Sequence, residues 1–170
     1  MRRALPATLA ILAAAALQVG IAPHVGIGGV VPNLLLLVVI TLAFMEGSQA
    51  GMVAGFSAGL LLDLLGTGPV GAWALVLAVT GYVTGLVAAN LFAEGWLLPV
   101  TVAAVACLLA EGAYAFELTM FGEGANLAGA LLTKVLPGAV YNAALALLVY
   151  PWLARAMRRE PRLTELRRIG

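Results

Sequence analysis

The chain has few charged residues and few of the residue types on which enzymes depend. Charged residues make up 10% of its 170 residues, and it has one cysteine and one histidine. Cys107 cannot form an internal disulfide, and a small buried apolar side chain is the simplest interpretation of it. His24 stands alone in a glycine-rich segment, so we interpret it as a solvated side chain. No catalytic triad, metal-ligand cluster or cofactor motif is present in the sequence, and we expect neither an enzyme nor a nucleic-acid partner.

Hydrophobic residues, by contrast, account for 63% of the chain, against roughly 45–50% in soluble domains. A soluble protein of 170 residues could not bury that fraction of hydrophobic side chains in its core. A membrane-spanning helix needs about 20 residues, so six spans would use most of the length. The composition therefore predicts an all-α polytopic membrane protein, with a six-helix transmembrane domain at residues 1–156 and a basic tail at 157–170.

Apolar runs and turn residues place the six predicted spans. We expect them at residues 4–22, 31–45, 49–65, 70–91, 96–121 and 126–153. The second and third are short, so a re-entrant hairpin that leaves four full spans is an alternative. Pro32 would stand at the start of the second helix, and Ser48 could cap the third. Pro137 should kink the sixth, because proline removes a backbone hydrogen bond.

The basic residues gather at the two ends of the chain. Eight of the nine lie there: Arg2, Arg3, Arg155, Arg158, Arg159, Arg162, Arg167 and Arg168. Because cytoplasmic segments of membrane proteins are enriched in arginine and lysine, this distribution predicts two cytoplasmic ends and an even number of spans. The tail would either anchor the chain at the lipid surface or dock a partner, and the anchor is the simpler interpretation.

Glycines recur at every fourth residue of the third span. They are Gly47, Gly51, Gly55 and Gly59. On a helix this spacing produces a face without side chains, which is typical of closely packed membrane helices. Gly81 and Gly85 repeat the spacing in the fourth span. The glycine face would meet either the fourth span or a helix of a partner, and the internal contact is the more economical of the two.

We single out five polar side chains inside the predicted spans, where such groups are costly. They are Asp63, Glu111, Glu117, Lys134 and Asn142. Asp63, Glu117 and Lys134 share the outer boundary. There they would either reach interfacial water or form a cluster in which Asp63 and Lys134 fix the helix register. Glu111 and Asn142 should reach a similar depth near the centre. A protonated Glu111 that donates to the Asn142 carbonyl would satisfy both groups, and a proton or substrate pathway is the alternative.

Four stretches form a recognisable pattern: VPNLLLLVVITLAF, GSQAGMVAGFSAGLLLDLLGTGPVGAWAL, GYVTGL and LPGAVYNAALALLVYPWLARAMRR. Together they resemble the bacterial rod shape-determining protein MreD family over spans two to four and six. The matching motif residues are Pro32, Asn33, Asp63, Pro137, Asn142 and Pro151. The family often has Pro-Asp where this chain has Pro32-Asn33, so no role that needs an acid is carried over to Asn33.

The resemblance implies a multi-pass subunit of the lateral-wall elongation machinery in the bacterial inner membrane. Such a subunit would bind the single-span protein MreC and, through it, peptidoglycan synthases and the MreB cytoskeleton. Whether such a subunit also forms a homodimer is left open. The family is also similar in architecture to the substrate-binding subunits of energy-coupling-factor vitamin transporters, so an uptake subunit is the alternative function. A vitamin pocket would need several aromatic and polar groups near the outer leaflet, where only Trp73, Tyr114 and the charged trio qualify.

Overall fold

The computed structural model describes residues 4–90, 97–122 and 126–157, and these fold into six helical rods. The helices are α1 (Ala4–Gly20), α2 (Leu34–Glu46), α3 (Ser48–Leu65), α4 (Ala72–Asn90), α5 (Leu97–Met120), α6 (Leu127–Ala130) and α7 (Leu136–Met157). A short 3-10 helix, η1 (Ala22–Val25), follows α1, and a π-helical turn, η2 (Leu131–Val135), joins α6 to α7 into one rod. The connection between the fourth and fifth predicted spans at residues 91–96, the tail beyond Met157 and the terminal arginines other than Arg155 lie outside the described residues.

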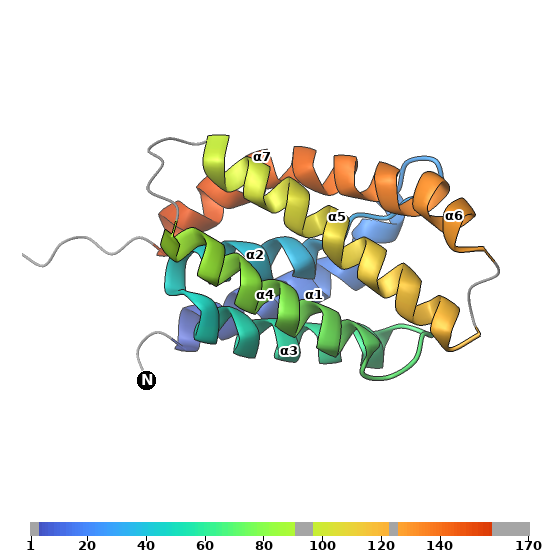
Figure 1. Cartoon of the computed structure of the whole chain (residues 1–170). Coiled ribbons are helices and arrows are strands. Elements are labelled where there is room, and N and C mark those ends of the chain that lie inside the picture. The colour runs from blue at the N-terminus through green and yellow to red at the C-terminus, as the bar shows by residue number, and fades with distance from the viewer. Residues whose placement is uncertain (1–3, 91–96, 123–125, 158–170) are drawn as a thin grey trace, which may run out of the picture.

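Four rods are long and apolar enough to cross a membrane, which confirms the predicted all-α polytopic membrane protein. They are α3, α4, α5 and the rod that spans Leu127–Leu153, while α1 and α2 are shorter apolar helices. The rods lie side by side, and α1 begins at the same end of the bundle at which α7 ends (Figure 1). We call this the terminal end and the opposite one the distal end.

The short helix α2 lies in the middle of the bundle. Its residues Leu35–Ala43 are all buried, and it contacts α1, α3, α4, α5 and α7 (Figure 1). A helix that is apolar on every side is stable only when other helices surround it. Because its neighbours shield it from lipid, the 13 residues of α2 need not span the bilayer by themselves.

Two predicted helix starts are corrected. The second helix begins at Leu34 rather than at Val31, because the Asn33 side chain caps it by accepting the Leu36 N–H at 3.0 Å, and Pro32 stays outside the helix. Ser48 does not cap α3. Gly47 is the N-cap residue, with φ at +90°, and its side-chain-free backbone makes the tight α2–α3 turn.

Glycines allow α3 and α4 to touch through their backbones. A Cβ atom added at Gly51 would lie 2.5 Å from the carbonyl oxygen of Gly81 and 2.6 Å from the Cβ of Ala43. A Cβ at Gly55 would overlap the carbonyl group of Leu77 in α4. No side chain larger than hydrogen fits these positions without moving the two helices apart.

The same contact extends along both helices. A Cβ at Gly59 would overlap the backbone at Trp73, and one at Gly85 would overlap the backbone at Ser48. Gly47 differs, because a Cβ there would meet nothing within 4 Å. The glycine face of α3 therefore meets α4 rather than a second protein, and Gly47 serves the turn before it.

The kink predicted at Pro137 takes the form of a widened turn. The N–H of Leu136 donates to the Leu131 carbonyl, five residues back, and Pro137 is the second residue of α7. A π-helical turn beside a proline is a known way to accommodate its missing N–H. Pro151 lies inside α7.

We predict that Gly55→Ala lowers the free energy of unfolding by at least about 2 kcal/mol, because the new methyl group would overpack the α3–α4 contact. Gly112→Ala in α5 is the matched control, since a Cβ there meets nothing within 4 Å, and it should leave stability equal or slightly higher. Thermal unfolding of both variants in the same detergent measures the difference. Equal melting temperatures for the two would contradict the backbone contact.

Candidate functional site

Asp63, near the end of α3, caps the helix that follows it. Its Oδ2 accepts the backbone N–H groups of Gly71 at 2.9 Å and Ala74 at 3.1 Å, and its Oδ1 accepts that of Trp73 at 3.0 Å. The side chain is 4% exposed. The first N–H groups of a helix lack partners within the helix, so one carboxylate fixes both the α3–α4 turn and the start of α4.

The structure corrects the predicted pairing of Asp63 with Lys134. Both Asp63 oxygens are occupied by backbone N–H groups, and among the described residues Lys134 forms no ion pair. The Lys134 side chain is exposed at the distal end, which agrees with the alternative in which it reaches interfacial water. Backbone donors, rather than a lysine, therefore hold Asp63 in place.

Glu117 of α5 lies close enough to Asp63 for the two charges to interact. Between α4 and α5 the ring of Trp73 stacks on that of Tyr114, with centroids 4.0 Å apart and planes inclined at 18°. The aromatic pair available for a ligand pocket is thus used in packing one helix against the other.

A second polar group lies in the interior, centred on Asn142 of α7. Its Oδ1 accepts the backbone N–H of Asn33 at 2.9 Å, and its Nδ2 donates to Glu111 Oε1 at 3.0 Å. Asn142 is completely buried. The structure brings Glu111 and Asn142 together, but the predicted direction of the bond is reversed. The Asn142 carbonyl is already used by Asn33, so the amide group faces Glu111.

Side chains form hydrogen bonds with the backbone groups just before α2 and at its first residue. Gln18 of α1 accepts the Leu34 N–H at 2.7 Å and donates to the Pro32 carbonyl at 2.9 Å. Irregular backbone inside a membrane protein needs such partners, because lipid offers none. Gln18, Asn33, Asn142 and Glu111 therefore form one polar cluster that joins α1, α2, α7 and α5; we call it the α2-entry cluster.

Sequence reasoning missed Gln18 and the capping role of Asn33. The signal for Asn33 was available, since asparagine directly before an apolar run is a typical N-cap. Nothing local to Gln18 indicates its partners, which lie 14 and 16 residues further along the chain. Pro32, also a motif residue, is fully buried beside this cluster.

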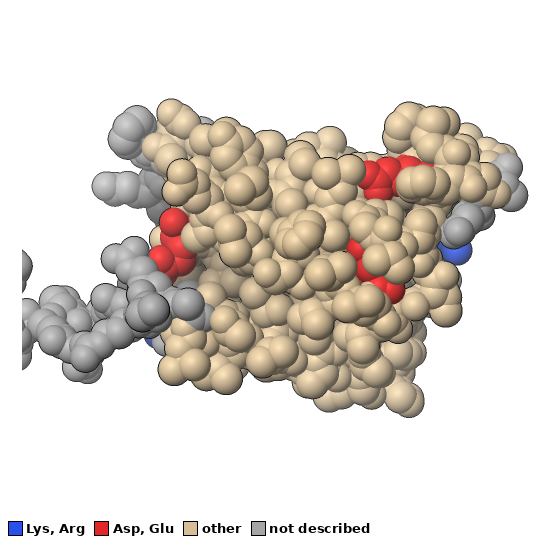
Figure 2. Space-filling model, turned by 90° about the horizontal axis from the view of Figure 1, so that it is seen from below, with Lys and Arg blue, Asp and Glu red and all other residues tan. Residues whose placement is uncertain are grey.

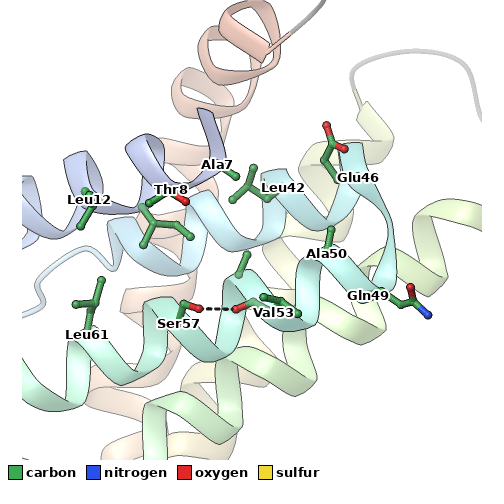
Figure 3. A pocket seen from close by; sticks show the side chains of 12 residues that line it. Ala7, Thr8, Leu12, Leu42, Glu46, Gln49, Ala50, Val53, Ser57 and Leu61 are labelled. Atoms are coloured by element: carbon green, nitrogen blue, oxygen red, sulfur yellow. Dashed lines mark hydrogen bonds between the residues drawn. The ribbon is translucent and has the colours of Figure 1, made fainter. Parts of the chain in front are cut away.

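The face shown in Figure 2 is largely uncharged, with a few small acidic patches. A groove of about 520 Å³ runs between α1 and α3. In Figure 3 Thr8 and Leu12 of α1 lie opposite Ser57 and Leu61 of α3, with Leu42 of α2 between the two helices. A second groove, of about 440 Å³, lies between α4 and α5. Within the described residues no group of three or more His, Cys, Asp or Glu could hold a metal ion.

A family model described as rod shape-determining protein MreD matches residues 1–159. The chain belongs to the MreD family. It is therefore a rod shape-determining, multi-pass protein of the inner membrane, from a family of shape-determining structural membrane proteins that are not known as enzymes. No curated protein and no solved structure matches it. The likeness to transporter substrate-binding subunits stays a prediction.

We predict that Asn142→Leu lowers the free energy of unfolding by about 2–3 kcal/mol, because it leaves the buried Asn33 N–H and Glu111 Oε1 without partners. Glu111→Gln is the control. Its side-chain carbonyl can still accept from the Asn142 amide, so stability should be retained. Thermal unfolding in detergent tests both. An Asn142→Leu variant as stable as the unmodified chain would show that the cluster does not hold α2.

We predict that Asp63→Asn destabilises the protein by about 1–3 kcal/mol, since the amide has one acceptor oxygen for three backbone donors. Lys134→Gln should have no measurable effect, because that side chain is exposed. The same unfolding assay compares the two. A measurable loss for Lys134→Gln, together with a double variant that loses less stability than the sum of the two single effects, would restore the discarded Asp63–Lys134 pair.

Proposed function

We propose that this protein is a non-enzymatic subunit of the bacterial cell-elongation complex. It binds a single-span MreC-like protein inside the membrane and, through that protein, helps to position peptidoglycan synthases relative to the MreB cytoskeleton. The family match over residues 1–159 carries this proposal. A protein of this kind acts by presenting fixed surfaces to its partners, and it needs no reacting groups of its own.

The interior polar groups support a scaffold. Asp63 accepts three backbone N–H groups at the start of α4, and Asn142 bonds to both Asn33 and Glu111. Side chains held in this way stabilise helix positions and are not available to a substrate without breaking the fold. The interaction between Glu111 and Asn142 accounts for a costly intramembrane acid by structure alone, so a proton pathway is not needed to explain it.

The arrangement of the ends supports a cytoplasmic location for both termini. The six rods bring the start of α1 and the end of α7 to the same end of the bundle (Figure 1). The arginines of the sequence stand beside these two positions, and arginine favours the cytoplasmic side. In this orientation the distal end, with Asp63 and Glu117, faces outward.

Affinity purification tests the proposal. The full-length protein carries a C-terminal tag in its native host and is extracted in a mild detergent. The expected result is recovery of a single-span MreC-like protein in stoichiometric amount, with peptidoglycan synthases at lower yield. A tagged, unrelated six-span protein from the same membrane is the control.

Two results would contradict the proposal. One is recovery of the coupling and ATPase subunits of a transporter in place of the MreC-like protein. The other is a vitamin that remains bound through purification. Either result would favour the uptake-subunit alternative.

A further inference from the structure

One carboxylate oxygen in the described part of the chain is buried without a hydrogen-bond partner. It is Oε2 of Glu117 in α5; the side chain as a whole is half-buried, but this atom is covered. A buried polar atom without a partner is costly. The nearby charge of Asp63 adds electrostatic repulsion. Since no described residue donates a hydrogen bond to this oxygen, a donor for Glu117 would have to come from another molecule.

Glu117 lines the groove between α4 and α5, together with Thr80 and Thr84 of α4. The two threonines are four residues apart, so their hydroxyl groups share one face of the helix. Within the described residues neither hydroxyl makes a hydrogen bond. Other helical threonines here do, since Thr41 and Thr119 each donate to the carbonyl four residues back. Thr84 is buried, so the groove presents two partly exposed side chains with unused hydrogen-bonding capacity, Glu117 and Thr80, along an otherwise apolar wall.

We propose that the α4–α5 groove binds a transmembrane helix of the partner protein. A hydrogen-bond donor on that helix, preferably a basic side chain, reaches Glu117 at the distal end, and a smaller polar side chain meets Thr80 nearer the middle. The inference rests on the proposed function, which supplies a single-span partner. A lipid chain fits the groove less well, because it carries no donor or acceptor at the depth of the threonines. The two acids favour a basic donor by charge complementarity.

The larger groove between α1 and α3 is also lined by polar side chains, among them Thr8 and Gln49, but among the described residues none of its polar atoms is identified as buried without a partner. Its Ser57 hydroxyl donates to the Val53 carbonyl of its own helix at 2.9 Å, as the dashed line in Figure 3 shows. Glu46, at the terminal end of that groove, has an interaction of its own. Among the described residues, the buried oxygen without a partner lies in the α4–α5 groove and not here.

Photo-crosslinking locates the partner helix. A photoreactive amino acid replaces either Val79 in the α4–α5 groove or Val53 in the α1–α3 groove, positions that are 54% and 63% exposed. Each variant is expressed as the full-length protein, together with the MreC-like partner, in native membranes. We expect a crosslink to the partner from Val79 and none from Val53. A partner crosslink from Val53 alone overturns the inference but leaves the proposed function standing. Absence of the partner from both crosslinking and affinity purification overturns both.

Substitutions test the polar contacts themselves. Glu117→Leu and Thr80→Val should each reduce recovery of the partner about threefold or more, as expected for the loss of an interhelical hydrogen bond in lipid. The isolated Glu117→Leu protein should unfold at an equal or higher temperature, because it no longer buries an unpaired oxygen. Ser57→Ala in the other groove is the control and should retain full recovery. Unchanged recovery with both groove variants, or a loss explained by lower stability, overturns the inference.

Discussion

The bundle depends on satisfying the backbone at the start of α2. This helix is short and surrounded, so its first N–H groups lie where neither water nor lipid can accept from them. Gln18 accepts the Leu34 N–H, Asn33 accepts that of Leu36, and Asn142 accepts that of Asn33. These side chains come from α1, from the cap itself and from α7. These hydrogen bonds form only when all three segments are correctly placed around the start of α2. The α2-entry cluster therefore determines the positions of the first and last helices relative to each other.

Packing by glycine and capping by Asp63 act on the same pair of helices. Gly51 and Gly55 allow α3 to approach α4 to backbone contact, which provides dispersion energy but does not by itself define how far one helix slides along the other. Asp63 removes that freedom, because its two oxygens must reach three particular N–H groups at the start of α4. Close approach and register therefore come from different residues, and neither is sufficient alone.

The sequence was enough to predict the helices and much less informative about their polar contacts. Apolar runs and glycine spacing depend on residues near one another in the chain, so the six helices and the α3–α4 glycines could be inferred from local pattern. The partner predicted for Asp63 was wrong, because a sequence shows which side chains are present but not which backbone N–H groups lack a partner in the fold. Lys134 was the basic side chain predicted at the same depth. The reversed bond between Glu111 and Asn142 has a similar cause. Its direction depends on Asn33, 109 residues away from Asn142.

Hydrogen-bond satisfaction separates the polar groups that maintain the fold from those available for association. In lipid there is little hydrophobic force to bring helices together, so polar side chains and close packing contribute most of the specificity. Asp63 and Asn142 are buried, and both form hydrogen bonds within the chain that hold neighbouring segments in place. Glu117 has the same chemical type as Glu111 and lies on the same helix, but its covered oxygen has no donor among the described residues. The difference between the two glutamates lies in their surroundings. For that reason the distal part of the α4–α5 surface is where a second helix would lower the free energy of this protein most.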